Sequence, residues 1–193
     1  AMPGVEEIIL VLHPDDAERA QAELWDTLHG LGVDLIVAGG ASRAESVWKG
    51  LQVVGPAMEL VAVHDAVRPF VSRRTCELLF RMAAKRGAAV PVVPLADTVK
   101  RVEGDAVVET PRRFGLVRVQ TPQVFQSDLF IDAFEYALAH GGLSDVVTDD
   151  ASLVEAMKKP VAVVLGEEAN FKITTPRDLR IAEALLAAGA VED

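Results

Sequence analysis

The sequence predicts one α/β domain that is built on a mainly parallel, twisted sheet with helices on both of its faces. Short apolar runs of strand length alternate along the chain with segments of helical periodicity, which is the pattern of βαβ units. In addition, 193 residues with 50% hydrophobic composition are enough for one large hydrophobic core. No internal repeat or low-complexity segment interrupts them, so we treat residues 1–193 as a single domain.

The expected strands are short apolar runs, and the expected helices carry apolar residues at helical spacing. We place strands at residues 7–12, 34–38, 60–64, 88–93, 116–120 and 161–165. We place helices at residues 15–28, 43–54, 72–86, 127–139, 149–158 and 176–188. The last helix has the clearest start, because Thr175 suits the N-cap, Pro176 the first helical position and Asp178 a capping-box-like pattern.

Residues 98–113 interrupt this alternation. Within them, residues 102–107 are typical of two short strands on either side of a turn that contains Gly104. Because an isolated hairpin is only marginally stable in water, this one must pack against something. The residues alone do not say whether that is its own domain or another molecule.

The composition argues against nucleic-acid binding and against a membrane-spanning protein. The formal net charge is −10, whereas proteins that bind a phosphate backbone need a basic face. No apolar run approaches the roughly 18 residues that a transmembrane helix requires. The single cysteine, Cys76, excludes an internal disulfide and shares an expected helix face with Leu79 and Phe80. A buried thiol in a cytoplasmic protein is the simplest interpretation.

The strand expected at residues 60–64 ends in a segment that carries both signs of charge. Asp65 and Arg68 follow it three residues apart, and Pro69 disfavours a helical conformation at Arg68. In open α/β sheets, ligands bind beyond the carboxyl ends of the strands, so this segment has the layout of an active-site edge. Taken alone, it is also compatible with a surface ion pair between the two residues.

Further motifs accompany this segment in a fixed order. They are residues 39–47 (GGASRAESV), 97–101 (DTVKR), Arg113 with 120–125 (QTPQVF), 148–151 (TDDA) and 170–179 (NFKITTPRDL). Together with residues 64–69 (HDAVRP), they resemble the 2-C-methyl-D-erythritol 4-phosphate cytidylyltransferases of the non-mevalonate isoprenoid pathway. The resemblance runs from near residue 5 to near residue 186. It is specific, because all of these motifs occur in the order and spacing of the family. It implies a Rossmann-like nucleotidyltransferase fold in which residues 98–113 form a protruding β-arm.

One departure from the family pattern concerns the N-terminal region. Members open with a strand and a Gly-rich loop of the type A-A-G-x-G-x-R, followed by a Pro-Lys-Gln segment, and this sequence contains neither. The resemblance aligns residues 1–5 with the end of the family's first helix. We therefore expect that the loop segment, with its half of the nucleotide site, is missing from this chain.

The reaction that the resemblance implies joins two phosphates. The phosphate of 2-C-methyl-D-erythritol 4-phosphate attacks the α-phosphorus of CTP and releases pyrophosphate. Because no covalent enzyme intermediate is needed, the protein has to hold two polyanions in line and stabilise the charge of the transition state. Basic side chains are expected to provide this charge stabilisation, together with a magnesium ion on the triphosphate. Six basic residues fall in or beside the motifs, namely Arg43, Arg68, Arg112, Arg113, Arg118 and Lys172.

The resemblance assigns catalytic roles to Lys172 and Arg113. Lys172 lies between two apolar residues just after a probable strand end, and the matching family lysine contacts phosphate. Arg113 matches an arginine that grips the substrate phosphate from the arm of the neighbouring subunit, and a guanidinium suits phosphate geometry. The resemblance thus implies a homodimer that is held by the β-arm, with a hairpin folded onto its own domain as the alternative.

Other residues complete the implied site. Substrate-binding residues are Asp65, Arg68, Thr98, Thr121 and Thr148, of which Thr148 equally suits a helix N-cap. Nucleotide-binding residues are Gly39, Gly40, Ser46, Asp65, Ala66 and Lys172, the glycines letting the backbone approach the base. Asp65 is also the expected protein ligand of Mg²⁺. Thr121 is expected to donate its hydroxyl to the substrate, and His64 to be a hydrogen-bonding residue rather than a base.

Two other functions compete with this one. A ribitol-5-phosphate cytidylyltransferase would have the same fold and many of the same motifs, but residues 97–100 and Ala66 look more like the methylerythritol enzymes. An inactive nucleotide-binding homologue is suggested by the absent Gly-rich loop. The favoured prediction is a cytoplasmic homodimeric enzyme whose partners are CTP and a sugar-alcohol phosphate.

Overall fold

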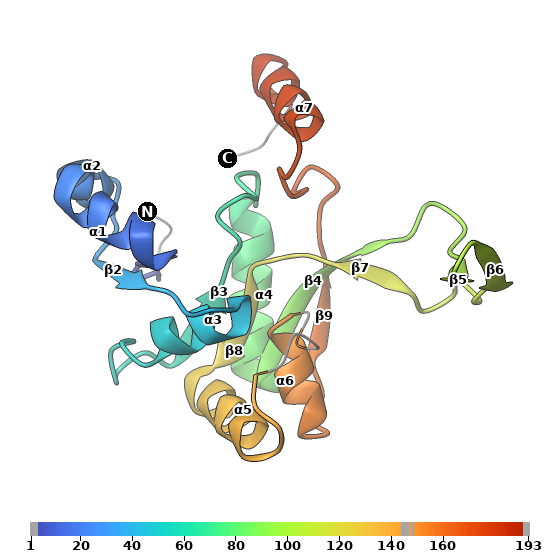
Figure 1. Ribbon diagram of the computed structural model, residues 1–193, viewed down its shortest axis with the longest axis horizontal. Helices are drawn as coiled ribbons and strands as arrows, with labels where there is room; N and C mark the ends of the chain where they lie inside the picture. Colours follow the sequence, from blue (N-terminus) through green and yellow to red (C-terminus); the bar gives the residue numbers. More distant parts are fainter. Residues whose placement is uncertain (1–3, 144–146, 148, 191–193) are drawn as a thin grey trace.

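The computed structural model describes residues 4–143, 147 and 149–190. Its N-terminal part carries two parallel strands with two helices between them and one helix after them (Figure 1). In chain order these are β1 (Ile9–Leu12), α1 (Pro14–Glu23), α2 (Trp25–Gly30), β2 (Leu35–Ala38) and α3 (Arg43–Leu51). The helix expected at residues 15–28 is therefore two helices, because the backbone at Leu24 leaves the helical region with φ −120° and ψ −2°.

A five-stranded sheet forms the centre of the molecule. Its strands are β3 (Leu60–Val63), β4 (Ala88–Pro94), β7 (Val117–Val119), β8 (Gln123–Gln126) and β9 (Ala162–Leu165). β4 pairs in parallel with β9 and antiparallel with β7 and β8, and β8 continues antiparallel to β3. The α/β class is confirmed, but this sheet is mixed rather than mainly parallel.

The chain runs back along β4 as two separate strands, β7 and β8. Because both are antiparallel to β4, the sheet is mixed. β7 pairs with the end of β4, where Val92 faces Val119, and β8 pairs with its start, where Ala89 faces Val124. Between them the register shifts at residues 120–122, next to Pro122, which has no N–H to donate to a ladder. Sequence reasoning ended the strand there and missed β8.

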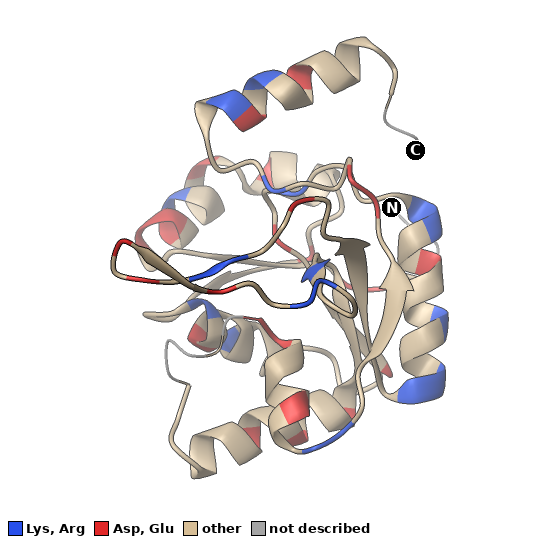
Figure 2. Ribbon diagram, turned by 90° about the vertical axis from the view of Figure 1, so that its right-hand side faces the viewer, with Lys and Arg blue, Asp and Glu red and all other residues tan. Residues whose placement is uncertain are grey.

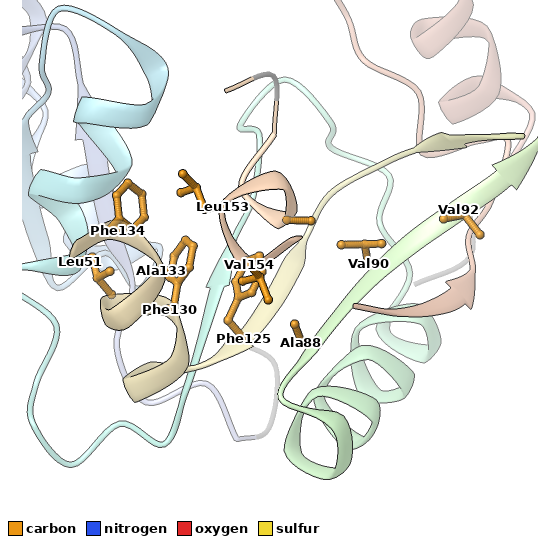
Figure 3. Packing of buried hydrophobic residues seen from close by; sticks show 11 residues of the cluster. Leu51, Ala88, Val90, Val92, Phe125, Phe130, Ala133, Phe134, Leu153 and Val154 are labelled. Atoms are coloured by element: carbon orange, nitrogen blue, oxygen red, sulfur yellow. The ribbon is translucent and has the colours of Figure 1, made fainter. Parts of the chain in front are cut away.

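Alternate residues of the sheet face two different layers of helices. Val90 and Phe125 belong to a core with α5 (Ser127–Ala139) and α6 (Ala151–Ala156), whereas Ala89 and Val124 pack against α4 (Arg73–Arg86). Figure 3 shows the first of these cores, in which the rings of Phe125 and Phe130 stack with centroids 4.2 Å apart. All but the last residue of β4 are buried, as expected for a strand that is covered on both faces.

Two peripheral elements extend away from the sheet. The hairpin of β5 (Arg101–Glu103) and β6 (Ala106–Glu109) projects to one side, and α7 (Pro176–Ala187) lies at the top of Figure 1. α7 begins with the predicted capping box of Thr175 and Asp178. Every residue of β5 and β6 is exposed, so the hairpin is not folded onto its own domain. Among the residues that the structure describes, no helix has both the length and the apolar composition needed to cross a membrane.

Candidate active site

The turn after β3 places Asp65 and Arg68 beyond the carboxyl end of that strand. The Arg68 N–H donates to the Asp65 carbonyl at 2.9 Å, which closes the turn. The Asp65 N–H donates to the Thr121 hydroxyl at 3.0 Å, so the turn is also tied to the segment between β7 and β8. Both residues therefore follow the end of β3 as the sequence predicted, and both charged side chains are mostly buried, with 14% of each exposed.

Three cations surround the Asp65 carboxylate. Its oxygens lie 3.3 Å from Lys172 Nζ, 3.4 Å from Arg43 Nη2 and 3.4 Å from Arg68 Nε. Burial alone would raise the pKa of Asp65, but the charges of Lys172 and Arg43 and the hydrogen bonds of Lys172 and Arg68 lower it below its usual value. Asp65 is therefore ionised at neutral pH. It brings together Arg68 of its own turn with Arg43 and Lys172, which lie far from it in the chain.

Arg43 is held on its other side by a second carboxylate. It is the first residue of α3, whose N-cap Ser42 accepts from the Glu45 N–H. Its two terminal nitrogens donate to the two oxygens of Asp150 at 3.0 and 2.8 Å, and the Asp150 side chain is fully buried. Burial raises the pKa of Asp150, and the hydrogen bonds and charge of Arg43 oppose that rise. The pair fixes the guanidinium beside Asp65.

Lys172 is positioned by a buried amide network under its loop. The Gln120 amide donates to the carbonyls of Glu167 and Asn170 at 2.7 and 3.0 Å, and the Asn170 amide donates to the Thr121 carbonyl at 2.8 Å. Arg68 Nη1 also donates to the Asn170 carbonyl at 2.9 Å. These bonds anchor the loop on which Lys172 stands to the sheet and to the Asp65 turn.

These side chains line a small pocket. Its volume is about 170 Å³, and its walls are formed by Arg43, Asp65, Arg68, Val119, Gln120, Thr121, Gln123, Asp149 and Lys172. A larger hollow of about 360 Å³ is lined by Pro56, Ala57, Met58, Glu59, Leu60, Ala84, Gln126, Ser127 and Asp128. It contains two carboxylates and no lysine or arginine, so the smaller pocket is the one suited to phosphates.

The glycines before α3 serve close packing in this structure. A Cβ on Gly39 would lie 2.6 Å from Ser46 Oγ, and one on Gly40 would lie 2.4 Å from Glu45 Cβ. The Ser46 hydroxyl accepts from the Gly40 N–H at 3.0 Å and donates to the Ser42 carbonyl at 2.8 Å. Gly39, Gly40 and Ser46, three of the six predicted nucleotide-binding residues, thus shape the loop that leads to Arg43. Contact with the base stays a prediction.

Other predicted residues are not among those that line the pocket. Arg113 is exposed at the base of the arm and donates to the Ala96 carbonyl, and Thr98 and Ala66 are exposed. Thr148 lies outside the described residues.

Of the six basic residues in or beside the motifs, three converge on the pocket, namely Arg43, Arg68 and Lys172. Arg118 instead pairs with Glu168, with 2.6 Å between Arg118 Nη2 and the nearer carboxylate oxygen. Figure 2 shows acidic and basic residues mixed along the arm.

Sequence reasoning assigned no role to Asp150, Asp149 or Gln123. Gln123 is 1% exposed, donates to Asp149 at 3.0 Å and accepts from the Ala151 N–H at 2.9 Å. Its membership of the QTPQVF motif, and that of the two aspartates in TDDA, was the available signal. Their contacts join segments far apart in the chain, so the motifs alone could not reveal them.

Comparison with known proteins identifies the family. The family model described as 2-C-methyl-D-erythritol 4-phosphate cytidylyltransferase matches residues 1–188. The chain belongs to this family. A curated cytidylyltransferase of that name from Halalkalibacterium halodurans is 50% identical over 93% of this chain and 77% of its own, and one from Symbiobacterium thermophilum is 45% identical over 95% and 75%.

Solved structures of cytidylyltransferases in this family share the fold. The enzyme from Thermus thermophilus matches with a TM-score of 0.76 and 37% identity over 94% of this chain and 82% of its own. The 4-diphosphocytidyl-2C-methyl-D-erythritol synthase from Anaerococcus prevotii matches with a TM-score of 0.83 and 33% identity over 96% and 81%. The Rossmann-like nucleotidyltransferase fold that the motifs implied is therefore confirmed.

Proposed function

We propose that this protein transfers the cytidylyl group of CTP to 2-C-methyl-D-erythritol 4-phosphate and forms 4-diphosphocytidyl-2-C-methyl-D-erythritol and pyrophosphate. Membership of the cytidylyltransferase family supports the reaction. The observation that carries the assignment to a site is the pocket in which Arg43, Arg68 and Lys172 meet around Asp65. A ribitol-5-phosphate cytidylyltransferase and an inactive homologue are not favoured by these relatives.

The chemistry follows from the charges. An oxygen of the methylerythritol phosphate attacks the α-phosphorus of CTP, and the bond from that phosphorus to the oxygen that leads to the β-phosphorus breaks as pyrophosphate leaves. The attacking phosphate is already ionised near neutral pH, so no general base is required. Lys172 and the arginines hold the two polyanions together and stabilise the added negative charge of the transition state. Asp65 keeps these cations aimed at the pocket before the substrates arrive.

Magnesium fits this pocket only as a partner of the triphosphate. The part of the chain that the structure describes contains no group of three or more His, Cys, Asp or Glu side chains that could hold a metal ion. Asp65 is one carboxylate among three cations. Mg²⁺ commonly takes one carboxylate, several waters and substrate phosphates, so Asp65 would supply the protein ligand. The ion would neutralise part of the triphosphate charge.

The arm supports a homodimer. Val102, Val107 and Val108 are 55%, 59% and 44% exposed, and the neighbouring Phe114 is fully exposed. An extended hairpin with outward apolar residues gains stability when another surface covers it. A second copy of this chain would cover the arm and bring Arg113 to the neighbouring pocket. The unpaired, buried Cys76 supports a reducing, cytoplasmic location.

A pyrophosphate-release assay tests the function. The complete protein is incubated with CTP, Mg²⁺ and either methylerythritol phosphate or ribitol 5-phosphate, and we expect turnover with the first acceptor. Lys172→Ala should lower the rate by about 10² to 10³, the scale for losing one preorganised donor. Lys85→Ala, on the exposed end of α4, is the matched control. Release with ribitol 5-phosphate alone, or equal rates for the two variants, would contradict the proposal.

A further inference from the structure

Glu167 connects the loop that carries Lys172 to the start of α4. This segment, the Lys172 loop, comprises residues 166–173 and follows β9. The Oε1 atom of Glu167 accepts from the Ser72 hydroxyl at 2.5 Å and from the Thr75 hydroxyl at 2.7 Å. Ser72 is the N-cap of α4, and the two hydroxyl residues are buried, with 6% and 3% exposed. One carboxylate therefore joins segments that lie 92 to 95 positions apart in the chain.

The hydrogen-bonding capacity of these groups makes Glu167 the acceptor of both hydroxyl hydrogens. An ionised carboxylate only accepts, and each hydroxyl has one hydrogen to donate. The Ser72 oxygen already accepts from the Thr75 N–H at 3.1 Å, as the N-cap of α4. Its hydrogen could instead reach the Thr75 oxygen at 3.2 Å, but the carboxylate is closer and charged, so it is the stronger acceptor. The N-terminus of this 14-residue helix also favours a negative charge.

The backbone of Glu167 is fixed on its other side by Gln120. The Glu167 N–H donates to Gln120 Oε1 at 3.3 Å, and the Glu167 carbonyl accepts from Gln120 Nε2 at 2.7 Å. At the other end of the loop, the Ile173 N–H donates to the Val67 carbonyl at 2.9 Å. Lys172 therefore stands between two anchored points, and Glu167 belongs to the first of them.

We propose that Glu167 is a positioning residue, which aims Lys172 at the pocket by tying the Lys172 loop to the N-terminus of α4. The Lys172 side chain is 44% exposed, and its Nζ lies 3.3 Å from Asp65 Oδ2. Packing alone does not hold so exposed an ammonium, so its place depends on the backbone beneath it. Glu167 is not among the residues that line the pocket, so it acts without touching the substrates. The role rests on the proposed function, because it acts through a cation of that reaction.

Loss of this anchor should lower kcat more than it raises KM. A displaced ammonium stabilises the transition state less well, and complete loss of such a donor costs about 10² to 10³ in rate. We therefore expect Glu167→Ala to lower kcat by about tenfold, and Glu167→Gln, which keeps an oxygen that can accept from both hydroxyls, by about threefold. The corresponding Glu168 variants are the matched controls. Glu168 pairs with Arg118 at the surface, so they should stay within about twofold of the wild type.

A double-mutant cycle separates positioning from a general loss of structure. If Glu167 acts through Lys172, Glu167→Ala should change kcat by less than about twofold in the Lys172→Ala background. Thr75→Val removes one of the two donors to Glu167 and leaves the Ser72 cap, so it provides the same test if Glu167→Ala does not fold. It should lower kcat by about threefold, and only when Lys172 is present. Losses that multiply, full activity of the Glu167 variants, or a change confined to KM would overturn the proposal.

A second readout does not depend on turnover. Cys76, the single cysteine of the chain, directly follows Thr75 and is 7% exposed. Burial and the negative charge of Glu167 both raise the pKa of its thiol. Glu167→Gln should therefore speed the reaction of Cys76 with iodoacetamide at about pH 8 by about twofold or more, whereas Glu168→Gln should not. Equal rates for the two variants would overturn the contact between Glu167 and α4. An inactive wild type with the expected thiol rates would refute only the proposed function.

Discussion

Removal of Asp150 should be among the most damaging single changes near the site. Its fully buried carboxylate accepts two hydrogen bonds from Arg43, a residue 107 positions away in the chain. Loss of one partner of a buried pair leaves the other charge without compensation and typically costs 3–5 kcal/mol of unfolding free energy. The Arg43 side chain is 37% exposed and keeps Asp65 at 3.4 Å. We therefore expect the lower end for Asp150→Ala, about 3 kcal/mol.

Urea denaturation at pH 7 measures this loss. For a slope of about 2 kcal/mol per molar urea, the midpoint should fall by about 1.5 M. Asp150→Asn keeps the size and one carbonyl acceptor, so it should lose less. Asp132→Ala, on the exposed face of α5, is the matched control and should stay within about 0.5 kcal/mol of the wild type.

A double variant separates the ion pair from the loss of packing. If Arg43 and Asp150 act as a pair, Arg43→Met combined with Asp150→Ala should be more stable than the sum of the two single losses predicts, by about 2 kcal/mol. Strictly additive losses, or a loss below about 1 kcal/mol for Asp150→Ala, would refute the account of Arg43 as a cation held by a buried counter-charge.

Three further predictions concern the arm, the central carboxylate and the loop before α3. If Arg113 reaches the partner's pocket, mixed Arg113→Ala and Lys172→Ala chains should regain about a quarter of wild-type activity, because half of the random dimers hold one intact site of two; no recovery after verified subunit exchange would contradict this. The pKa of Asp65 is lowered in the folded protein, so its ionised carboxylate contributes stability above its unfolded pKa of about 3.9, and this contribution is lost as the pH falls through the folded pKa. The difference in unfolding free energy between the wild type and Asp65→Asn should therefore shrink below about pH 4. A difference that stays constant there would count against the lowered pKa. Gly39→Ala would place a Cβ 2.6 Å from Ser46 Oγ and should lower the free energy of unfolding, measured by thermal denaturation, by about 1–3 kcal/mol. Gly55→Ala is the control, because its Cβ would have its nearest contact at 3.8 Å. Equal melting temperatures for the two variants would refute the packing argument.

Local signals were sufficient for most elements and for part of the site. β4 was predictable because a run of apolar residues that is buried on both faces has no other simple interpretation. The start of α7 was predictable because a capping box involves only neighbouring residues. Asp65 and Arg68 were predictable because they follow an apolar run and belong to a family motif. Lys172 was predictable from its family motif alone, because the strand expected just before it, β9, already ends at Leu165. The structure places all three in one pocket.

The remaining features depend on contacts between distant segments. No local pattern encodes the direction of β8, because its antiparallel pairing follows from how the chain turns back along β4. The sequence shows that residue 43 is a charged arginine, but only the fold brings its side chain to the buried Asp150. The tertiary structure likewise brings the Asp65 N–H and the His64 ring, 56 and 57 positions away in the chain, to the Thr121 hydroxyl, because the turn after β3 packs against the segment between β7 and β8.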